Sequence, residues 1–153
     1  MTAVVPSLAT AIVFSIVEMG ITWWVARRLR NNGIVDAVWA AGFAAIVGCL
    51  HGVAWFRGAP RPAVDLPFLL LTVLVALWSG RLALHLAVRV RSHHPREDVR
   101  YAALRQEWGA QVDRKMFWFF QLQGMLQVVL ATPFVRSEEH TSELQSHLNL
   151  VCR

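Results

Sequence analysis

The chain is 153 residues long, with 56% apolar residues, 16% charged residues and a formal net charge of +5. Its mean hydropathy of +0.42 exceeds what a water-soluble domain of this size usually has. The composition therefore argues against a soluble helical bundle and favours a protein whose solvent is the lipid bilayer. We expect no nucleic-acid partner.

Four apolar stretches approach the roughly 20 residues that a membrane-spanning helix needs, namely residues 4–26, 34–56, 66–88 and 116–135. Basic residues or turn formers bound each stretch. The sequence predicts an all-α fold, a polytopic membrane helix bundle with about four transmembrane helices of a larger parent, together with one interfacial helix. Five tryptophans lie at or near the expected helix ends, as interfacial aromatics do: Trp23, Trp24, Trp55, Trp108 and Trp118.

The positions of the arginines predict the topology. Connections 27–33 and 89–115 are rich in arginine, whereas the short second connection has only Arg57 and Arg61 and the N-terminal region has no basic side chain. By the positive-inside rule, connections 27–33 and 89–115 are cytoplasmic and the N-terminus lies outside.

Residues 136–153 differ from everything before them, because the composition changes from apolar to polar without a turn signal. Residues 136–146 also match the translation of a common short-read sequencing adapter. We therefore expect residues 1–135 to be the N-terminal part of a membrane domain and residues 136–153 to be an artefactual or disordered tail. On this interpretation the chain is a truncated fragment.

Three residues are candidates to line a substrate cavity. Glu18 lies about two turns inside the first stretch, where an ionised carboxylate is costly unless it is paired or faces water. A protonated or snorkelling Glu18 with no function is equally compatible with that position. Asp36 lies in the first turn of the second stretch, where the helix dipole favours a carboxylate even for structural reasons alone. Trp39 follows it by nearly one turn, so both side chains can face the same cavity.

The third stretch carries a polar stripe. Trp78, Arg81, His85 and Arg89 follow a three- or four-residue spacing, which stacks them along one helix face. Because arginine inside a membrane is expensive, we expect Arg81 to face the bundle interior and to meet Asp36, Glu18 or a bound phosphate. The stripe predicts either a ligand-binding site or a structural ion pair.

The long third connection predicts an amphipathic interfacial helix over residues 97–108, because Pro95 can open a helix and acidic residues follow it. Arg100 and Arg105 would then point to headgroups or to an anionic ligand. The adjacent His93 and His94 have no further ligands at suitable spacing, so no metal site is expected. The sequence contains neither a phosphate-cradling glycine loop nor a recognisable nucleophile with its base, which leaves the catalytic residues unknown.

An ordered set of motifs carries a family resemblance. It consists of NNGIVDAVW at 31–39, LWSGRLALH at 77–85, EDVRY at 97–101, LR at 104–105, WG at 108–109 and FFQLQG at 119–124. No single motif is decisive, but the ordered set resembles the N-terminal half of the bacterial DUF1295 family. That family is placed in the steroid 5-alpha-reductase-like superfamily of membrane enzymes.

The resemblance implies a multi-helix enzyme of the bacterial inner membrane that uses NADPH to reduce the enone double bond of a lipid or steroid-like substrate. By position it also implies that Asp36 and Trp39 line the substrate cavity, with arginines on phosphate and Tyr101 in a polar contact. The residues that it places at the cofactor are Arg81, His85, Arg89, Asp98, Tyr101 and Arg105.

The family's most recognisable cofactor-binding element, Arg-His-Pro-x-Tyr, should follow the fourth span, where this chain has the adapter-like segment. We therefore expect the fragment itself to be inactive. Two other function classes stay open. One is a membrane methyltransferase of the same superfamily that uses S-adenosylmethionine. The other is a noncatalytic four-helix membrane protein or a small transporter, although compact transporters lack so long a third connection.

Overall fold

The computed structural model describes the backbone of residues 4–56 and 66–151 and the side chains of residues 7–50, 52 and 69–132. Every regular element in these residues is helical, which confirms the predicted all-α fold. The elements are α1 (Val4–Leu29), α2 (Ile34–Phe56), α3 (Leu66–His93), α4 (Val99–Trp108), the 3-10 turn η1 (Gly109–Gln111) and α5 (Val112–Val151).

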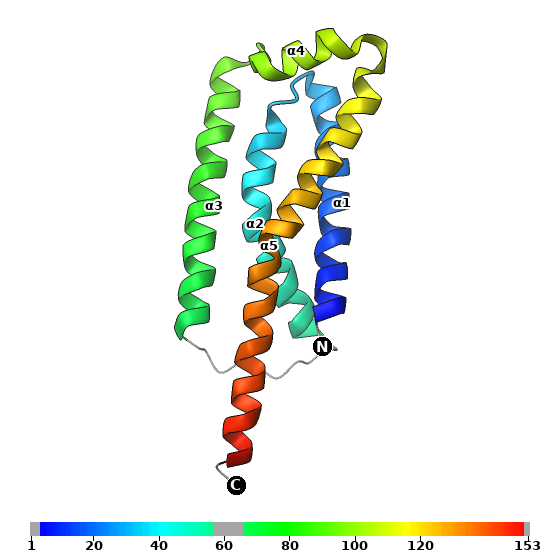
Figure 1. Ribbon diagram of the computed structural model, residues 1–153. Helices are drawn as coiled ribbons and strands as arrows, with labels where there is room; N and C mark the ends of the chain where they lie inside the picture. The colour runs from blue at the N-terminus through cyan, green and yellow to red at the C-terminus, as the bar shows by residue number, and fades with distance from the viewer. Residues whose placement is uncertain (1–3, 57–65, 152–153) are drawn as a thin grey trace.

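Four long helices run side by side, and the short α4 lies across one end of them (Figure 1). The most extensive packing joins α1 to α5 and α2 to α3, and α2 also packs on α1. Among the described residues, α3 makes no comparable contact with α1 or α5. The molecule is therefore a three-helix unit of α1, α2 and α5 with α3 attached to its α2 side.

α2 has the predicted bounds, and α4 begins two residues later than predicted, but the other three helices are longer than predicted. α1 and α3 continue to Leu29 and His93, and α5 runs from Val112 to Val151 without ending at residue 135. Residues 136–151 contain no Gly or Pro and include three Glu and three Leu, which have high helix propensity, so nothing in them ends the helix. Their expected artefactual origin stays a prediction.

The turn between α1 and α2 is a tight C-terminal cap. Arg30 has φ of +51°, and the N–H groups of Arg30 and Asn31 donate to the carbonyl oxygens of Arg27 and Ala26 at 3.3 and 3.1 Å. This is the Schellman arrangement, in which glycine is the usual residue at the left-handed position. The chain can then reverse direction within the few residues that separate the two helices.

Pro133 lies inside α5, where it has no N–H to donate to the Val129 carbonyl oxygen. The Thr132 hydroxyl donates to that same carbonyl oxygen. A side chain thus replaces the backbone donor that proline removes, and the helix continues.

The interior of the bundle contains two apolar clusters. One joins α1, α2 and α5 through Ala11, Ile46, Leu50, Val128 and Ala131. The other lies nearer to α4 and consists of Met19, Ala26, Val35, Tyr101, Met116 and Phe120.

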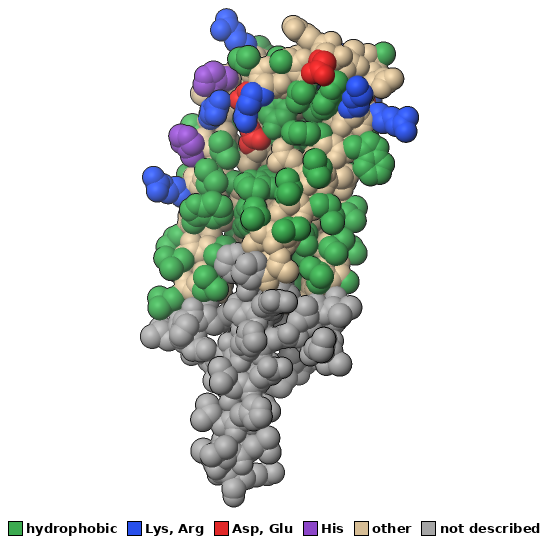
Figure 2. All heavy atoms as spheres, in the orientation of Figure 1, with side chains coloured by type: hydrophobic (Ala, Val, Ile, Leu, Met, Phe, Trp, Pro, Cys, Tyr) green, Lys and Arg blue, Asp and Glu red, His purple; other side chains and the backbone are tan. Residues whose placement is uncertain are grey.

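The outward faces of the long helices are also apolar. Large apolar side chains are exposed along α1, α3 and α5, including Leu77 (66%), Leu84 (66%) and Val129 (62%). In Figure 2 hydrophobic side chains cover the middle of the molecule, and charged side chains gather toward the end that carries α4. Contiguous apolar surface of this extent is unusual on a soluble monomer.

Two described helices, Ser7–Leu29 and Leu69–His93, are long and apolar enough to cross a membrane, and Ile34–Leu50 is a shorter apolar helix. The second and fourth predicted spans end among residues whose side chains lie outside the described part, as does Trp55.

Candidate functional site

The candidate site is a polar network at the α4 end of the bundle, and its centre is Asp36 in the first turn of α2. The Tyr101 hydroxyl donates to Asp36 Oδ1 at 2.7 Å, and Arg100 Nη2 donates to Asp36 Oδ2 at 2.8 Å. Tyr101 is 3% exposed, so its hydroxyl is fixed within the packed interior. The two oxygens of one carboxylate therefore hold two consecutive residues of α4.

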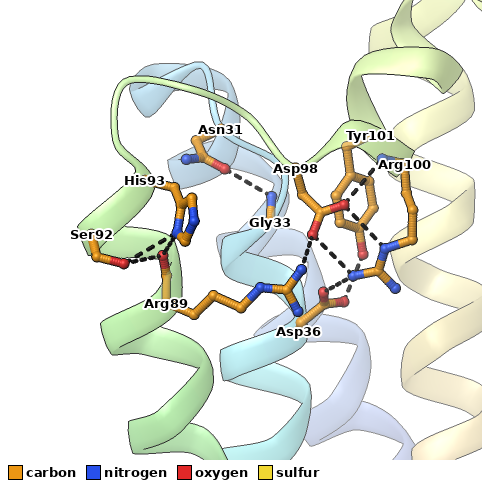
Figure 3. Close-up of polar contacts among 9 residues, drawn as sticks. All are labelled: Asn31, Gly33, Asp36, Arg89, Ser92, His93, Asp98, Arg100 and Tyr101. Carbon is orange, nitrogen blue, oxygen red and sulfur yellow. Dashed lines mark hydrogen bonds and ion pairs between the residues drawn. The ribbon is translucent and has the colours of Figure 1, made fainter.

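Asp98 extends this network from α4 to α3 (Figure 3). It caps the N-terminus of α4 by accepting from the Arg100 N–H at 3.0 Å, and it also accepts from Arg100 Nε at 3.1 Å. Arg89 Nη2 at the end of α3 donates to Asp98 Oδ2 at 2.9 Å. Two guanidinium groups and two carboxylates thus alternate in one continuous, charge-balanced chain.

A second ion pair ties α4 to the turn between α1 and α2. Glu97 accepts from Arg105 Nε at 2.9 Å and from both the backbone N–H and the side-chain amide of Asn32, at 2.9 and 2.8 Å. The Asn32 N–H belongs to the start of α2, where backbone donors have no partner within the helix. Glu97 supplies the missing acceptor, and it fixes the start of α4 to the α1–α2 turn.

These contacts shift the ionisation of the site. Hydrogen bonds from Arg100 lower the pKa of Asp98. Burial works against ionisation of Glu97, but the hydrogen bonds from Arg105 and Asn32 outweigh it and lower the pKa of that carboxyl. Burial and the hydrogen bond to Asp36 raise the pKa of Tyr101 above its ordinary value. Near neutral pH both carboxyls are therefore charged and the phenol is protonated.

Two cavities meet at the arginines. The first, of about 510 Å³, lies between the end of α3, the α1–α2 turn and the start of α4, and it includes Arg89, His93, Arg96 and Arg100. The second, of about 430 Å³, lies deeper, between α2, α3, α4 and α5. Arg89 and Arg100 line both cavities. The residues that line the second cavity are Asp36, Trp39, Leu82, Leu86, Arg89, Arg100, Tyr101, Leu104, Phe119 and Gln123.

The structure brings together several of the residues predicted from the sequence. Asp36 is bonded to Tyr101 and Asp98 to Arg89, and Arg100 links the two pairs. Trp39 lines the second cavity. Arg105 lies in the adjoining ion pair with Glu97. Their roles toward a cofactor or a substrate stay predictions.

Arg81 and His85 are not part of the network. Both are exposed on α3, and Arg81 pairs with none of the described carboxylates, so the expectation that Arg81 faces the bundle interior is wrong. The face of α3 that meets α2 carries Ser79, whose hydroxyl donates to the Ala40 carbonyl oxygen at 2.5 Å. The polar stripe is offset by one residue from that face, and only Arg89 reaches the site, because it lies at the helix end.

Glu18 also lies elsewhere. It lines a third cavity, of about 400 Å³, between α1 and α2, which does not include Asp36 or Trp39. The structure therefore keeps Asp36 and Trp39 at one cavity and separates Glu18 from them.

Two residues of the site, Asn32 and Glu97, have no place among the residues predicted from the sequence to bind a ligand. Arg100 was predicted only to point to headgroups or to an anionic ligand, and its contacts with Asp36 and Asp98 were not predicted. The sequence does indicate a role for Asn32, since a polar turn directly before a helix leaves backbone N–H donors that need an acceptor. The sequence indicates the contacts of Arg100 less clearly. Its neighbour Asp98 occupies the cap position, and an arginine two residues later can fold back on the same carboxylate.

Comparison with known proteins gives one match. The family model DUF1295, described as a protein of unknown function, matches residues 22–151. No curated protein and no solved structure matches the chain. The match includes α2, α3, α4 and every residue of the polar network. The chain therefore belongs to the DUF1295 family.

Proposed function

We propose that this chain belongs to a polytopic protein of the bacterial inner membrane that uses NADPH to reduce the carbon–carbon double bond of an enone in a lipid or steroid-like substrate. The observation that carries the proposal is the second cavity. Its walls are apolar at Leu82, Leu86 and Phe119, and its polar end is formed by Arg100 and Tyr101. A long apolar molecule with one carbonyl group fits such a lining.

The charge balance of the site favours a neutral ligand. Arg89 and Arg100 are matched by Asp36 and Asp98, so an added anion would meet no uncompensated positive charge among these four groups. A guanidinium has five N–H donors, and within the described residues Arg100 engages only those on Nε and Nη2. The remaining donors on Nη1 can polarise a carbonyl oxygen.

The first cavity fits the phosphate-bearing part of NADPH. Arg96 and His93 line it together with the two shared arginines, and Arg96 has no acidic partner among the described residues. Guanidinium groups suit phosphate because they offer paired donors in a plane. Since Arg89 and Arg100 line both cavities, a cofactor in the first would be adjacent to a substrate in the second.

When bound, NADPH supplies the hydride that adds to the β carbon of the enone. The negative charge then develops on the carbonyl oxygen, where Arg100 donates a hydrogen bond and lowers the energy of the transition state. Asp36 and Asp98 hold the guanidinium in place before the reaction begins. Tyr101 stays protonated and holds Asp36 in place through its hydrogen bond. A proton from water is then added to the α carbon. The apolar walls exclude other water from the double bond.

The proposal is tested with protein expressed from the source gene read beyond the codon for Val135. NADPH oxidation is measured in membranes with a 4-en-3-one steroid, and the product is identified by mass spectrometry. We expect Arg100→Met to lower kcat/KM about a hundredfold, as loss of a carbonyl-polarising donor does.

Arg91→Gln is the matched control, because Arg91 is exposed on α3 and lines neither cavity. It should retain the wild-type rate. A folded Arg100→Met variant that reduces the steroid as fast as wild type contradicts the assignment of the site. Transfer of a labelled methyl group from S-adenosylmethionine in place of reduction would assign the protein to the methyltransferase class.

A further inference from the structure

Three polar side chains at the contact of α1, α2 and α5 each have a buried oxygen atom without a partner among the described residues, and none of them belongs to the network at Asp36. Glu18 as a whole is half-buried. Ser15 is 1% exposed and Gln127 is 0% exposed. Within the described residues, Ser15 Oγ, Glu18 Oε2 and Gln127 Oε1 are buried and have no hydrogen-bond partner. Buried polar groups are nearly always paired in native proteins, so three unpaired oxygens in one region call for a ligand.

The three side chains form a single cluster. Ser15 and Glu18 lie one turn apart on the same face of α1. A Cβ atom at Gly42 would lie 2.8 Å from Glu18 Oε2 and 1.8 Å from Gln127 Nε2, which places both side chains against the same point of α2. On α5, Gly124 precedes Gln127 by one turn, and a Cβ atom there would lie 2.5 Å from Ser15 Oγ.

The amide of Gln127 is held in one orientation. Its Nε2 donates to the Trp39 carbonyl oxygen at 2.8 Å, which turns Oε1 away from that backbone acceptor. All three unpaired atoms are therefore oxygens that can accept, and nothing in the described interior donates to them. A group that brings positive charge or hydrogen to these oxygens would complete the cluster.

Glu18 lies eleven residues before the end of α1 at Leu29, or about 16 Å along the helix axis. Besides Glu18 and Thr22, its cavity is lined by apolar side chains such as Phe14, Val17 and Val38. A bare carboxylate is costly at such a place in a membrane helix unless a positive charge accompanies it. The described residues that line this cavity include no arginine or lysine.

We propose that Ser15, Glu18 and Gln127 form a buried site for one monovalent cation, a proton or Na⁺, which is independent of the reductase site. The number and charge of these oxygens favour this class of ligand. A divalent ion needs six or more oxygen ligands, whereas one carboxylate and two neutral oxygens suit a single charge.

Among the residues whose side chains the structure describes, no second titratable group faces Glu18. Its neighbours are Ser15 and Thr22 on α1, Ile34, Val38 and Gly42 on α2, and Gln127 on α5. A cation bound to the folded chain therefore depends on Glu18 alone for its compensating charge.

The test uses the 153-residue chain in lipid nanodiscs. Thermal unfolding is followed from about pH 5 to about pH 8, with Na⁺ or with choline at equal ionic strength. If the cation is a proton, the unfolding equilibrium constant of wild type rises by up to about tenfold per pH unit relative to Glu18→Gln, because the folded chain holds one more proton. If it is Na⁺, added Na⁺ lowers that constant at fixed pH, and Glu18→Gln abolishes the effect.

Glu107→Gln is the matched control, because Glu107 is exposed on α4 and should keep the wild-type response. Wild type and Glu18→Gln that respond identically to pH and to Na⁺ overturn the proposal. Should Glu18→Gln fail to fold, isotope-edited infrared spectra of wild type give a second reading. A carboxylate band of Glu18 that neither pH nor Na⁺ changes also overturns it.

Discussion

Tyr101 is the only tyrosine in the chain, which makes its ionisation directly measurable. Burial and the hydrogen bond to Asp36 raise the pKa of its hydroxyl above the ordinary value of about 10. We expect the ultraviolet signal of tyrosinate to appear at higher pH in the folded protein than in the unfolded chain. In Asp36→Asn the transition should move to lower pH, since the carboxylate no longer opposes a second negative charge.

The same shift predicts the effect of alkali on stability. The folded state keeps the phenolic proton at a pH where the unfolded chain has lost it. Tyr101 therefore contributes stability that is complete below about pH 10 and is lost as pH rises toward the folded-state value. Tyr101→Phe should abolish this part of the alkaline destabilisation. A folded wild type that titrates like free tyrosine would contradict the buried Tyr101–Asp36 contact.

At the scale of helices, glycines set how closely α1, α2 and α5 approach. A Cβ atom at Gly124 would lie 2.5 Å from Ser15 Oγ and 2.8 Å from Met19 Cγ, whereas at Gly20 or Gly48 it would meet nothing within 4 Å. We expect Gly124→Ala and Gly42→Ala to destabilise the bundle by about 1–3 kcal/mol through overpacking.

Gly20→Ala and Gly48→Ala are matched controls within α1 and α2. Both should be neutral or stabilising by up to about 1 kcal/mol, because alanine has the higher helix propensity. Thermal unfolding in nanodiscs measures all four variants. If the two groups of variants are destabilised equally, the helices are farther apart at Gly42 and Gly124 than they are in the structure.

The existence and type of the helices followed from the sequence, because runs of apolar residues and breakers are local signals. The face of each helix that packs inward did not follow from the sequence. The spacing of Arg81, His85 and Arg89 correctly puts them on one face of α3, but it holds no information about where α2 lies. The hydrogen bond from the Ser79 hydroxyl to the Ala40 carbonyl oxygen shows which face of α3 lies against α2. The pairing of Asp36 with Tyr101 likewise depends on how α4 crosses the bundle, which no local pattern predicts.

For the whole molecule, the distribution of charge predicts its placement. Charged side chains gather toward the α4 end, and exposed apolar side chains cover the rest of the described face (Figure 2). We expect α4 to lie at the cytoplasmic surface. A periplasmic reporter enzyme fused after Arg61 should be active, and the same enzyme fused after Gly109 should be inactive.

Reporter activities in the reverse order would overturn this topology while leaving the helix packing unchanged. Resistance of the chain to extraction from membranes by alkaline carbonate is the companion measurement. Release into the supernatant would contradict membrane insertion itself.

The extensive packing of α1 on α5 has a consequence for synthesis at the ribosome. α1 leaves the ribosome long before α5 has been synthesised. During this time Ser15 and Glu18 lack the α5 neighbours that they have in the finished protein. During that interval α2 alone can shield them, and α3 cannot help because it adds to the far side of α2. The packing around Ser15 and Glu18 is thus completed only when α5 closes against α1.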